Sequence, residues 1–499
     1  MNFIKNNYNL NSYYCTWTSQ AAISRLLKLS KGDFFDTARD CLKEETVFGE
    51  NGLIHQFPEI RDKLIFLFDD GWDVPYGLVN NNNGDFGSII VNEERFPSCT
   101  GEPKEKMKKL ADKVREFGWK GVGLWICASA KGEAWENMLS HEERVEYWSE
   151  RLEWSKYAGI SYWKVDWGSL CNDVNFRKLL NELKDKVYPE LVIEHAVCIG
   201  PLTDVDGENY TGRFENWGDI PKMMVALSEF SDVIRTYDVS GELQVPTTID
   251  RVQCLLRGGN ALNSKSHINA EDVSYICAAL SVQIGIMRSQ LKQDGVLIYK
   301  KTTESIRAVN WLSSFAPPLE IGEGTTNVSD EVLNDICDFS KVDSWVSKRV
   351  NGRKIQQGAP AIVTRNDELT DVDYLEESKP YVVSTRHPNG AYAVAVLPRL
   401  SIENKFFTPA VKLNISQNVD FPIGIFGETK EVNINYDSSV ENKKVFAQDL
   451  ASDEAVDITD KCVICGSTVK IDGELLNEIG TSKNPDGDVS SPGLVIKLV

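Results

Sequence analysis

The sequence predicts an α/β protein: a (β/α)8 TIM barrel with a C-terminal antiparallel β-sandwich domain. Through the first ~340 residues, short apolar runs alternate with segments of helical periodicity, which is typical of βαβ units and a parallel sheet. Polar residues recur where the apolar runs end, and barrel active sites are built at the C-terminal ends of the strands. No G-x-G-x-x-G or G-x-x-x-x-G-K-[ST] loop follows a strand, so nothing supports a dinucleotide or P-loop site.

The predicted elements of the barrel alternate in order along the chain, and at least five βα units can be recognised. Met107, Leu110 and Val114 recur at helical spacing before Gly118, which predicts an amphipathic helix that ends at the glycine. The expected strands are 64–70, 120–128, 160–168, 190–197 and 232–239, and the expected helices are 104–118, 141–159, 176–187 and 219–231.

Beyond about residue 340 the pattern changes to short β-type runs separated by Asn, Asp and Gly clusters. The segment 380–400 contains two such runs around Pro388-Asn389-Gly390, which predicts a β-hairpin. The expected domains are therefore a catalytic barrel at 1–340 and a β-sandwich at 341–499.

Composition excludes several classes of partner. The net charge is −20, from 54 basic and 74 acidic residues, which argues against nucleic-acid binding and against an anionic membrane surface. No apolar run of ~18 residues predicts a membrane span. With no signal peptide visible, the 11 cysteines favour a cytoplasmic protein with reduced thiols, or a secreted one if a leader has been removed.

No metal and no cofactor is expected. Cys462 and Cys465 form a lone C-x-x-C, whereas a structural zinc site usually has a second pair. The five histidines show no spacing typical of metal ligands. Whether the chain forms a homo-oligomer is left open.

The first candidate for chemistry is Lys164-Val165-Asp166 at the end of a predicted strand. Alternate residues of a strand share a face, so Lys164 and Asp166 are both expected to point into the mouth of the barrel. A carboxylate beside an ammonium group is favoured in its charged form, which suits a nucleophile. The alternative is an ion pair that only stabilises the end of the strand.

A second carboxylate follows a later predicted strand, in Arg235-Thr236-Tyr237-Asp238. Two inward carboxylates on different strands of one barrel are what glycoside hydrolysis requires. Arg235 is suited to bind substrate hydroxyls, and here too a salt bridge is the alternative.

A third motif is Asp69-Asp70-Gly71-Trp72, after the strand 64–70. The carboxylates can accept hydrogen bonds from sugar hydroxyls, and an indole can stack on the C–H face of a sugar. A polar loop with one anchoring tryptophan is the alternative. Further tryptophans lie at or near strand ends, at Trp17, Trp125, Trp163 and Trp167.

In this order, DDGW, RFPS (95–98), KGVGLWI, YWKVDWG and RTYD resemble motifs of clan D glycoside hydrolases. The resemblance is to the α-galactosidase and α-N-acetylgalactosaminidase families 27 and 36, and it covers roughly residues 13–300. It implies a retaining exo-glycosidase that acts on an oligosaccharide or glycoconjugate. By resemblance, Asp166 matches the nucleophile and Asp238 the general acid/base. The implied substrate-binding residues are Trp17, Asp69, Asp70, Trp72, Trp125, Lys164, Trp167, His195, Cys198 and Arg235.

The strand-five loop departs from the family pattern, because no Trp precedes Gly200 near His195 and Cys198. In the family this loop contacts the substituent at the 2-position of the sugar. Terminal α-galactose is the expected sugar, with α-N-acetylgalactosamine, β-L-arabinopyranose and raffinose-synthase-like transglycosylation as alternatives. A non-catalytic sugar-binding barrel is an alternative of another class. A Schiff-base aldolase is disfavoured, since a neighbouring acid keeps the pKa of Lys164 raised.

Overall fold

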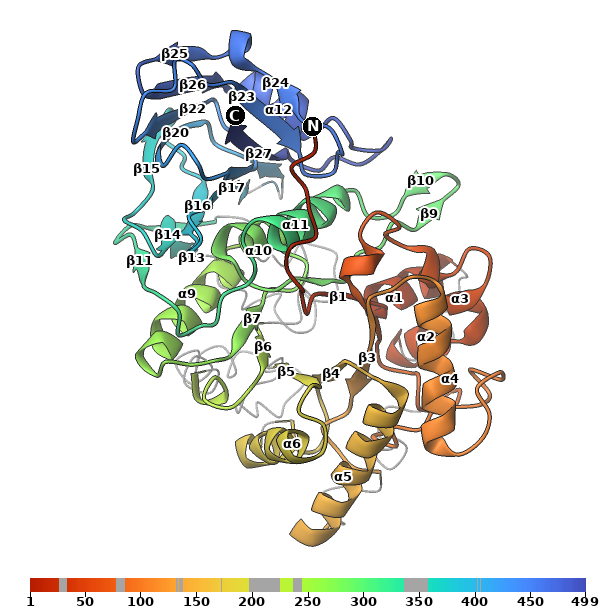
Figure 1. The fold of residues 1–499 in the computed structure, drawn as a ribbon. Helices are drawn as coiled ribbons and strands as arrows, with labels where there is room; N and C mark the ends of the chain where they lie inside the picture. Colours follow the sequence, from red (N-terminus) through yellow and green to blue (C-terminus); the bar gives the residue numbers. More distant parts are fainter. Residues whose placement is uncertain are drawn as a thin grey trace.

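The computed structural model describes residues 1–26, 34–77, 86–131, 133, 138–171, 173–196, 225–236, 245–335, 358–401, 403 and 405–499. These residues form a strand-and-helix barrel in the first part of the chain and a layered β region in the second (Figure 1).

Eight parallel strands form the barrel, which confirms the predicted fold. The sheet has the order β7-β6-β5-β4-β3-β2-β1-β8, and a parallel bridge between Asn269 and Gln283 brings its two ends together. Each strand therefore has a neighbour on both sides, as in a closed barrel. The strands are β1 Tyr13–Cys15, β2 Ile65–Phe68, β3 Gly121–Ile126, β4 Tyr162–Val165, β5 Val192–Ala196, β6 Val233–Arg235, β7 His267–Asn269 and β8 Gly285–Ile286.

Helices surround this barrel, and the local sequence sets their ends. In α5 the Ser140 hydroxyl accepts a hydrogen bond from the backbone N–H of Glu143, and Gly159 ends the helix in the left-handed conformation. α4 buries Met107, Leu110 and Val114 as the periodicity predicts. The helices are α1 Trp17–Leu26, α2 Phe34–Asp40, α3 Glu44–Phe48, α4 Pro103–Glu116, α5 His141–Ala158, α6 Val174–Val187, α9 Val245–Ala261, α10 Ser274–Leu280 and α11 Thr303–Ser314, with short 3-10 turns at Leu53–His55 and Arg61–Lys63.

The second part of the chain contains two larger sheets. The eight-stranded sheet has the order β11-β14-β16-β17-β21-β27-β23-β24 and the five-stranded sheet the order β15-β20-β22-β26-β25. The first consists of β11 Thr326–Val328, β14 Ile362–Arg365, β16 Tyr381–Arg386, β17 Tyr392–Leu397, β21 Ile423–Phe426, β27 Gly493–Leu498, β23 Val445–Asp449 and β24 Val456–Asp457. The second consists of β15 Asp371–Tyr374, β20 Val411–Gln417, β22 Glu431–Tyr436, β26 Thr468–Asp472 and β25 Val463–Cys465.

Short strand pairs and one helix complete this part of the chain. They are β12 Val332–Asn334 with β13 Gly358–Pro360, β18 Arg399–Leu400 with β19 Phe406–Phe407, the helix α12 Gly473–Gly480 and a 3-10 turn at Thr459–Lys461, whereas the pair β9 Lys292–Gln293 with β10 Val296–Leu297 precedes α11 in the barrel part. β11 begins at Thr326 and pairs with β14, so the strands of the β region start before the expected boundary at residue 340.

The two sheets enclose an apolar core, as in the predicted sandwich. Val394, Ile425 and Ile496 of the larger sheet pack with Leu413 and Ile434 of the smaller one. Most neighbouring strands are antiparallel, but the pairs β14–β16, β17–β21 and β20–β22 are parallel, so the sheets are mixed.

The predicted hairpin is confirmed, since β16 and β17 pair in antiparallel register. Gly390 in its turn has φ 94°, and a Cβ at this position would lie 2.5 Å from the Phe421 ring. Both the backbone conformation and the close ring therefore require glycine here.

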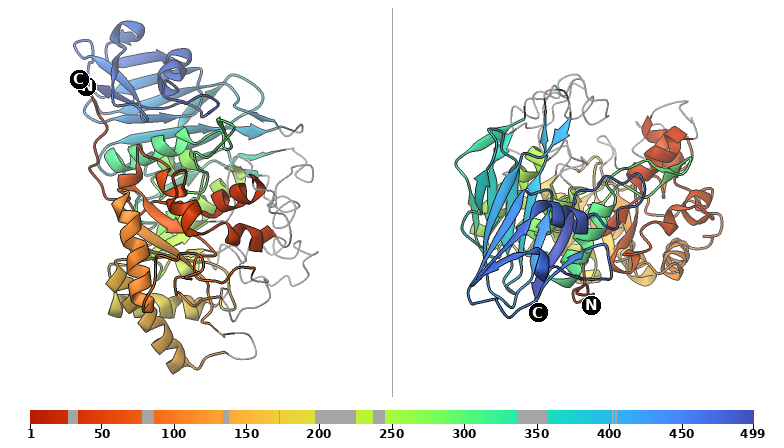
Figure 2. Two further views of the ribbon diagram at one scale, coloured as in Figure 1. Left: turned by 90° about the vertical axis from the view of Figure 1, so that its right-hand side faces the viewer. Right: turned by 90° about the horizontal axis from the view of Figure 1, so that it is seen from above.

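The barrel and the sandwich share a packed interface through α10 and α11, which lie between them (Figures 1 and 2). Trp311 and Tyr275 of these helices pack on Phe426 of the larger sheet, with ring centroids 5.9 and 5.0 Å apart. Arg307 of α11 donates from Nε and Nη2 to the Asp449 carboxylate at 2.8 and 3.0 Å. Both side chains of this ion pair are at most 1% exposed.

Within the described ranges, no helix combines the length and apolar character needed to cross a bilayer. Across the same ranges, no group of three or more His, Cys, Asp or Glu side chains is arranged to hold a metal ion.

Asp449→Ala should destabilise the protein by about 3–5 kcal/mol, because it leaves the buried Arg307 guanidinium without its carboxylate. Asp367→Ala is the matched control: it removes the partner of Arg386 from a pair whose side chains are 28% and 30% exposed. That change should cost less than about 1 kcal/mol. Urea denaturation measures both, and equal losses would contradict the role of burial.

Candidate active site

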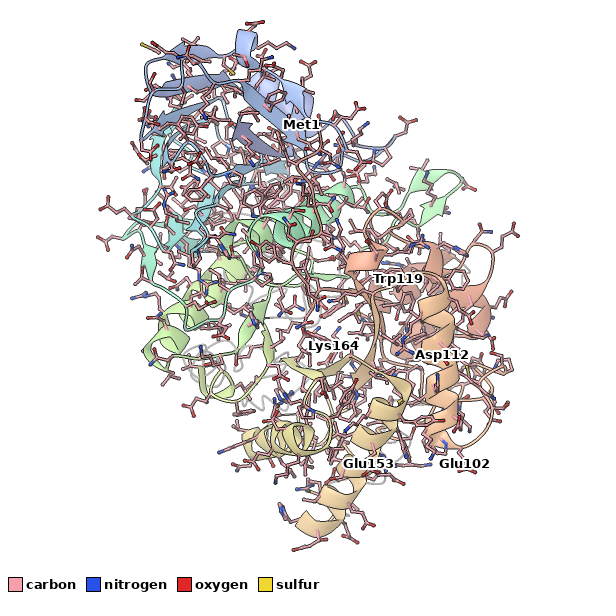
Figure 3. All side chains as sticks on the ribbon, viewed as in Figure 1. Met1, Glu102, Asp112, Trp119, Glu153 and Lys164 are labelled. Carbon is pink, nitrogen blue, oxygen red and sulfur yellow. The ribbon has the colours of Figure 1, made fainter. Side chains whose placement is uncertain are left out.

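The two-residue period of the strands decides which side chains enter the barrel. In the register of β4 and β5, Lys164 lies opposite Glu194 and Val165 opposite His195. The strand registers place a group of apolar side chains on the same inward side of the sheet as Lys164. They include Tyr13, Cys15, Ile65, Leu67, Trp125, Tyr162 and Val233. Figure 3 shows Lys164 within the ring of strands, whereas Glu102, Asp112 and Glu153 lie on the outer helices.

Arg235, the last residue of β6, is the centre of the polar interior. Its Nη2 donates to Asp166 Oδ2 at 3.1 Å and its Nη1 to Glu271 Oε2 at 2.9 Å. Its Nε lies 3.8 Å from Glu194 Oε1. The guanidinium is fully buried, so these carboxylates replace its hydration.

Lys164 is the second buried cation. Its Nζ lies 2.9 Å from Asp69 Oδ2, 3.3 Å from Glu271 Oε1 and 3.5 Å from Cys15 Sγ. The sequence predicts that Lys164 lies beside Asp166. In the part of the chain that the structure describes, Lys164 pairs instead with Asp69 and Glu271. The cation that pairs with Asp166 is Arg235.

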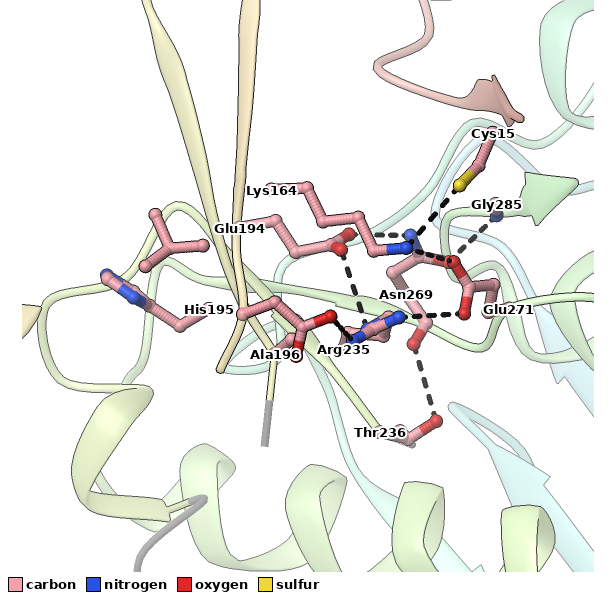
Figure 4. Close-up of polar contacts among 12 residues, drawn as sticks. Cys15, Lys164, Glu194, His195, Ala196, Arg235, Thr236, Asn269, Glu271 and Gly285 are labelled. Carbon is pink, nitrogen blue, oxygen red and sulfur yellow. Dashed lines mark hydrogen bonds and ion pairs between the residues drawn. The ribbon is translucent and has the colours of Figure 1, made fainter. Parts of the chain in front are cut away.

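The six charged residues Asp69, Lys164, Asp166, Glu194, Arg235 and Glu271 are referred to as the interior network. Figure 4 shows Lys164, Glu194 and Arg235, from three neighbouring strands, and Glu271, from the turn after β7, pointing toward one another.

The pKa of Lys164 is well above its usual value. Burial and Arg235 both lower this pKa, but Asp69, Cys15 and Glu271 raise it by more. Lys164 therefore stays an ammonium group, which agrees with the expectation that it is unsuited to Schiff-base chemistry.

Asp166 follows β4 directly and is 5% exposed. Besides Arg235, the indole Nε1 of Trp125 donates to its Oδ2 at 3.2 Å. Trp167 is half-buried, and its ring lies 5.6 Å from the Trp125 ring and 4.8 Å from the Phe86 ring. Asp166 is thus a fixed carboxylate with aromatic side chains beside it.

Asp69 and Asp70 take different partners although they are adjacent. Asp69 Oδ2 accepts from the Cys15 thiol at 2.9 Å and its Oδ1 from the backbone N–H of Asp70 at 2.8 Å. Asp70 Oδ2 accepts from Nε and Nη2 of Arg39 at 2.8 and 2.7 Å. Burial raises the pKa of Asp70 to about 6, with Arg39 acting in the opposite direction. Arg39 lies on α2, and no motif in the sequence predicts a role for it.

Two expected site residues lie on the outer side of the strands. Trp72 is fully buried, and its Nε1 donates to the carbonyl oxygen of Trp125 at 2.9 Å. The His195 ring contacts Arg177 Nη1 at 3.0 Å and Asn181 Oδ1 at 2.6 Å, both on α6. Burial, with Arg177, holds the pKa of His195 well below its usual value. His195 lies opposite Val165 and has the outward parity, and Trp72 lies beyond the end of β2 in the outer apolar core, so neither points into the mouth where it was expected; Figure 4 shows this for His195.

Three other expected residues remain to be placed. Trp17 begins α1 directly after β1 and packs, half-buried, against the interior apolar group. Cys198 and Asp238 lie outside the described residues.

Sequence reasoning missed Glu194 and Glu271. Glu194 accepts from the Tyr162 hydroxyl and the Asn269 amide, both at 2.7 Å, and from the Tyr13 hydroxyl at 3.1 Å. Strict alternation could have found Glu194, which has the inward parity of Lys164. Glu271 lies in a turn two residues beyond β7, a strand that the sequence pattern did not predict, so no local signal marked it.

Asp73 is a further buried acid near Asp70. Its Oδ2 accepts from the backbone N–H of Ile89 at 3.0 Å, and its Oδ1 is buried without a hydrogen-bond partner in the described part of the chain. Burial raises its pKa to about 7, with the charge of Asp70 acting in the same direction and the hydrogen bond from Ile89 opposing it. In the folded protein this carboxyl is therefore partly protonated at neutral pH.

No protein-family model and no curated protein sequence matches the chain. Among solved structures, it resembles a glycoside hydrolase family 27 β-L-arabinopyranosidase from Geobacillus stearothermophilus, at 9% identity and a TM-score of 0.43, covering 98% of this chain and 96% of that one. It also resembles α-galactosidase I from Mortierella vinacea, at 11% identity and a TM-score of 0.39, covering 99% and 98%. The α-galactosidase of Saccharomyces cerevisiae matches at 11% identity and a TM-score of 0.37, covering 100% and 96%. At this level of similarity, a function has to be argued from the residues of the barrel.

Asp73 should weaken the fold as the pH rises. Its folded pKa of about 7 lies above the ordinary value of 3.8, so stability present below about pH 4 is lost as the pH rises through 7. Asp73→Asn removes this loss while its amide oxygen keeps the bond from Ile89. The free energy of unfolding of this variant, relative to that of the wild type, should increase by roughly 2–4 kcal/mol between about pH 4 and pH 8. Urea denaturation at both pH values measures the difference, and a constant difference would show that burial does not shift this pKa.

Proposed function

We propose that this chain is a retaining exo-glycoside hydrolase that releases a terminal galacto-configured sugar. One observation carries the proposal: Asp166 is a buried carboxylate at the C-terminal end of β4, held by donors from Arg235 and Trp125. Barrel active sites are built at this end of the strands. The motif order that resembles the clan D families adds the assignment of roles.

In the proposed reaction, Asp166 attacks the anomeric carbon and forms a covalent glycosyl-enzyme. The guanidinium of Arg235 favours the ionised form that a nucleophile needs. Asp238, three residues beyond the end of β6, is the proposed acid that protonates the leaving oxygen and then the base that activates water. The two carboxyl groups are expected about 5–6 Å apart, the separation of retaining enzymes.

Asp69 and Lys164 are the proposed partners of the sugar hydroxyls. An axial O4 points off the ring face toward an acceptor on the second strand, so galactose is favoured over glucose. A buried carboxylate left without this donor would cost roughly 1–3 kcal/mol. Terminal α-galactose is therefore the first proposed substrate, cleaved from an oligosaccharide or glycoconjugate.

Arg39 favours β-L-arabinopyranose as a second candidate. Asp70 is one of the two acids expected to bind sugar hydroxyls, and its Oδ2 already accepts two hydrogen bonds from this guanidinium. An acceptor engaged in this way has less capacity for the hydroxyl at C6. β-L-Arabinopyranose has the ring configuration of α-galactose without the C6 hydroxymethyl group, so it needs no such acceptor.

A panel of nitrophenyl glycosides tests the function. The α-galactoside or the β-L-arabinopyranoside should exceed the α-glucoside in kcat/KM by about tenfold to a few hundredfold.

Arg39→Lys replaces the two-pronged contact with a point charge, so the ratio of α-galactoside to β-L-arabinopyranoside turnover should rise. A preference for the glucoside would refute the axial-O4 argument, and an unchanged ratio in the variant would remove Arg39 from substrate selection.

Asp166→Asn should lower kcat by at least about 10³-fold with little change in the unfolding temperature. The amide oxygen of Asn still accepts from Arg235 and Trp125, but it cannot form the covalent intermediate. Thermal unfolding and single-turnover kinetics are measured on the same preparation. A variant that melts early yet keeps its activity would instead indicate a structural ion pair.

A further inference from the structure

Glu271 contacts both buried cations of the interior network. Its Oε1 lies 3.3 Å from Lys164 Nζ and its Oε2 accepts from Arg235 Nη1 at 2.9 Å. The Tyr13 hydroxyl also donates to Oε1 at 2.8 Å. Its side chain is 1% exposed, so these contacts replace its hydration.

The two cations in turn contact different carboxylates of the proposed site. Lys164 reaches Asp69 and Arg235 reaches Asp166. Glu271 therefore lies between the residue proposed to bind the sugar and the residue proposed to attack it. It touches neither carboxylate through a bond that the structure describes, so any effect on them passes through the cations.

We propose that Glu271 is a positioning residue that fixes Lys164 on Asp69 and Arg235 on Asp166 at the same time. This rests on the function proposed above. Its physical basis is that two buried cations repel each other and separate unless an anion lies between them. With Glu271 in place, both side chains keep the geometry that orients the sugar and the nucleophile before the substrate arrives.

The charge of Glu271 is maintained by the same contacts. Burial raises its pKa, but Arg235 and Lys164 lower it by more, so the pKa lies below the usual range. The groups that face Glu271 are Lys164 on β4, Arg235 on β6 and the Tyr13 hydroxyl on β1, which is shared with Glu194 on β5, with Cys15 and Asp69 beyond Lys164.

Glu194 offers a matched control within the same interior. Its closest partners are the neutral groups of Tyr13, Tyr162 and Asn269, and Arg235 Nε lies farther away at 3.8 Å. A hydroxyl can donate or accept, so the tyrosines can adapt to an amide at this position. At Glu271 an amide has one carbonyl oxygen for two cations, and its NH2 group must face Lys164 or Arg235.

Kinetics of Glu271→Gln and Glu194→Gln separate positioning from general stability. Glu271→Gln should lower kcat/KM by about 100-fold, the loss expected from a misplacement of roughly 1 Å. Glu194→Gln should lower it by less than about tenfold. Glu271→Asp keeps the charge but is one methylene shorter, so it should recover part of the loss. The loss should appear in both kcat and KM, since the nucleophile and the sugar ligand both shift.

Crystal structures of the two glutamine variants read the geometry without any substrate. In Glu271→Gln, Lys164 should leave Asp69 or Arg235 should leave Asp166, while both pairs stay in place in Glu194→Gln. Unmoved cations in Glu271→Gln would overturn the proposal, as would equal losses of kcat/KM in the two variants. A wild-type protein inactive on every glycoside would refute the proposed function, and the displaced cations would still decide the role of Glu271.

Discussion

The charge balance around Arg235 is the constraint on which the interior of the barrel depends. A guanidinium without access to water requires acceptors at close range, and here Asp166 after β4 and Glu271 after β7 supply them, with Glu194 of β5 farther away at 3.8 Å. Lys164 adds a second cation within the same enclosed volume. Carboxylates from several strands therefore have to converge, and this convergence creates a set of fixed charges at the end of a barrel where chemistry takes place.

The outer layers keep this interior rigid. The barrel strands are short, between two and six residues, so their side chains are held by what surrounds them. α10 and α11 pack against the last strands on one side and against the sandwich on the other (Figure 1). The buried pair of Arg307 with Asp449 joins α11 to β23 across that interface. The sandwich thus packs against the barrel without contributing a described residue to the interior network.

Adjacent acids in this protein differ because their neighbours differ. Asp69 faces the interior and meets Lys164, whereas Asp70 faces the other way and meets Arg39 from α2. The next acid, Asp73, has no cation among its described partners, and burial raises its pKa to about 7. The segment 69–73 therefore contains a carboxylate paired with a lysine, a carboxylate fixed by an arginine and a carboxyl group whose pKa is about 7. Motif identity alone does not distinguish these three roles.

The sequence by itself determined the barrel, the hairpin at Gly390 and the inward direction of Lys164 and Asp166, because hydrophobic periodicity and turn chemistry are local properties. It also favoured a sugar-processing site through its motif order. Only the tertiary structure decided the partners. Lys164 pairs with Asp69 and Glu271 because residues far apart in the chain meet across a closed barrel, and no local pattern encodes that distance. Strict use of strand alternation would have selected Glu194, in place of His195, as the inward residue of β5. Only the folded chain places Glu271 between two cations.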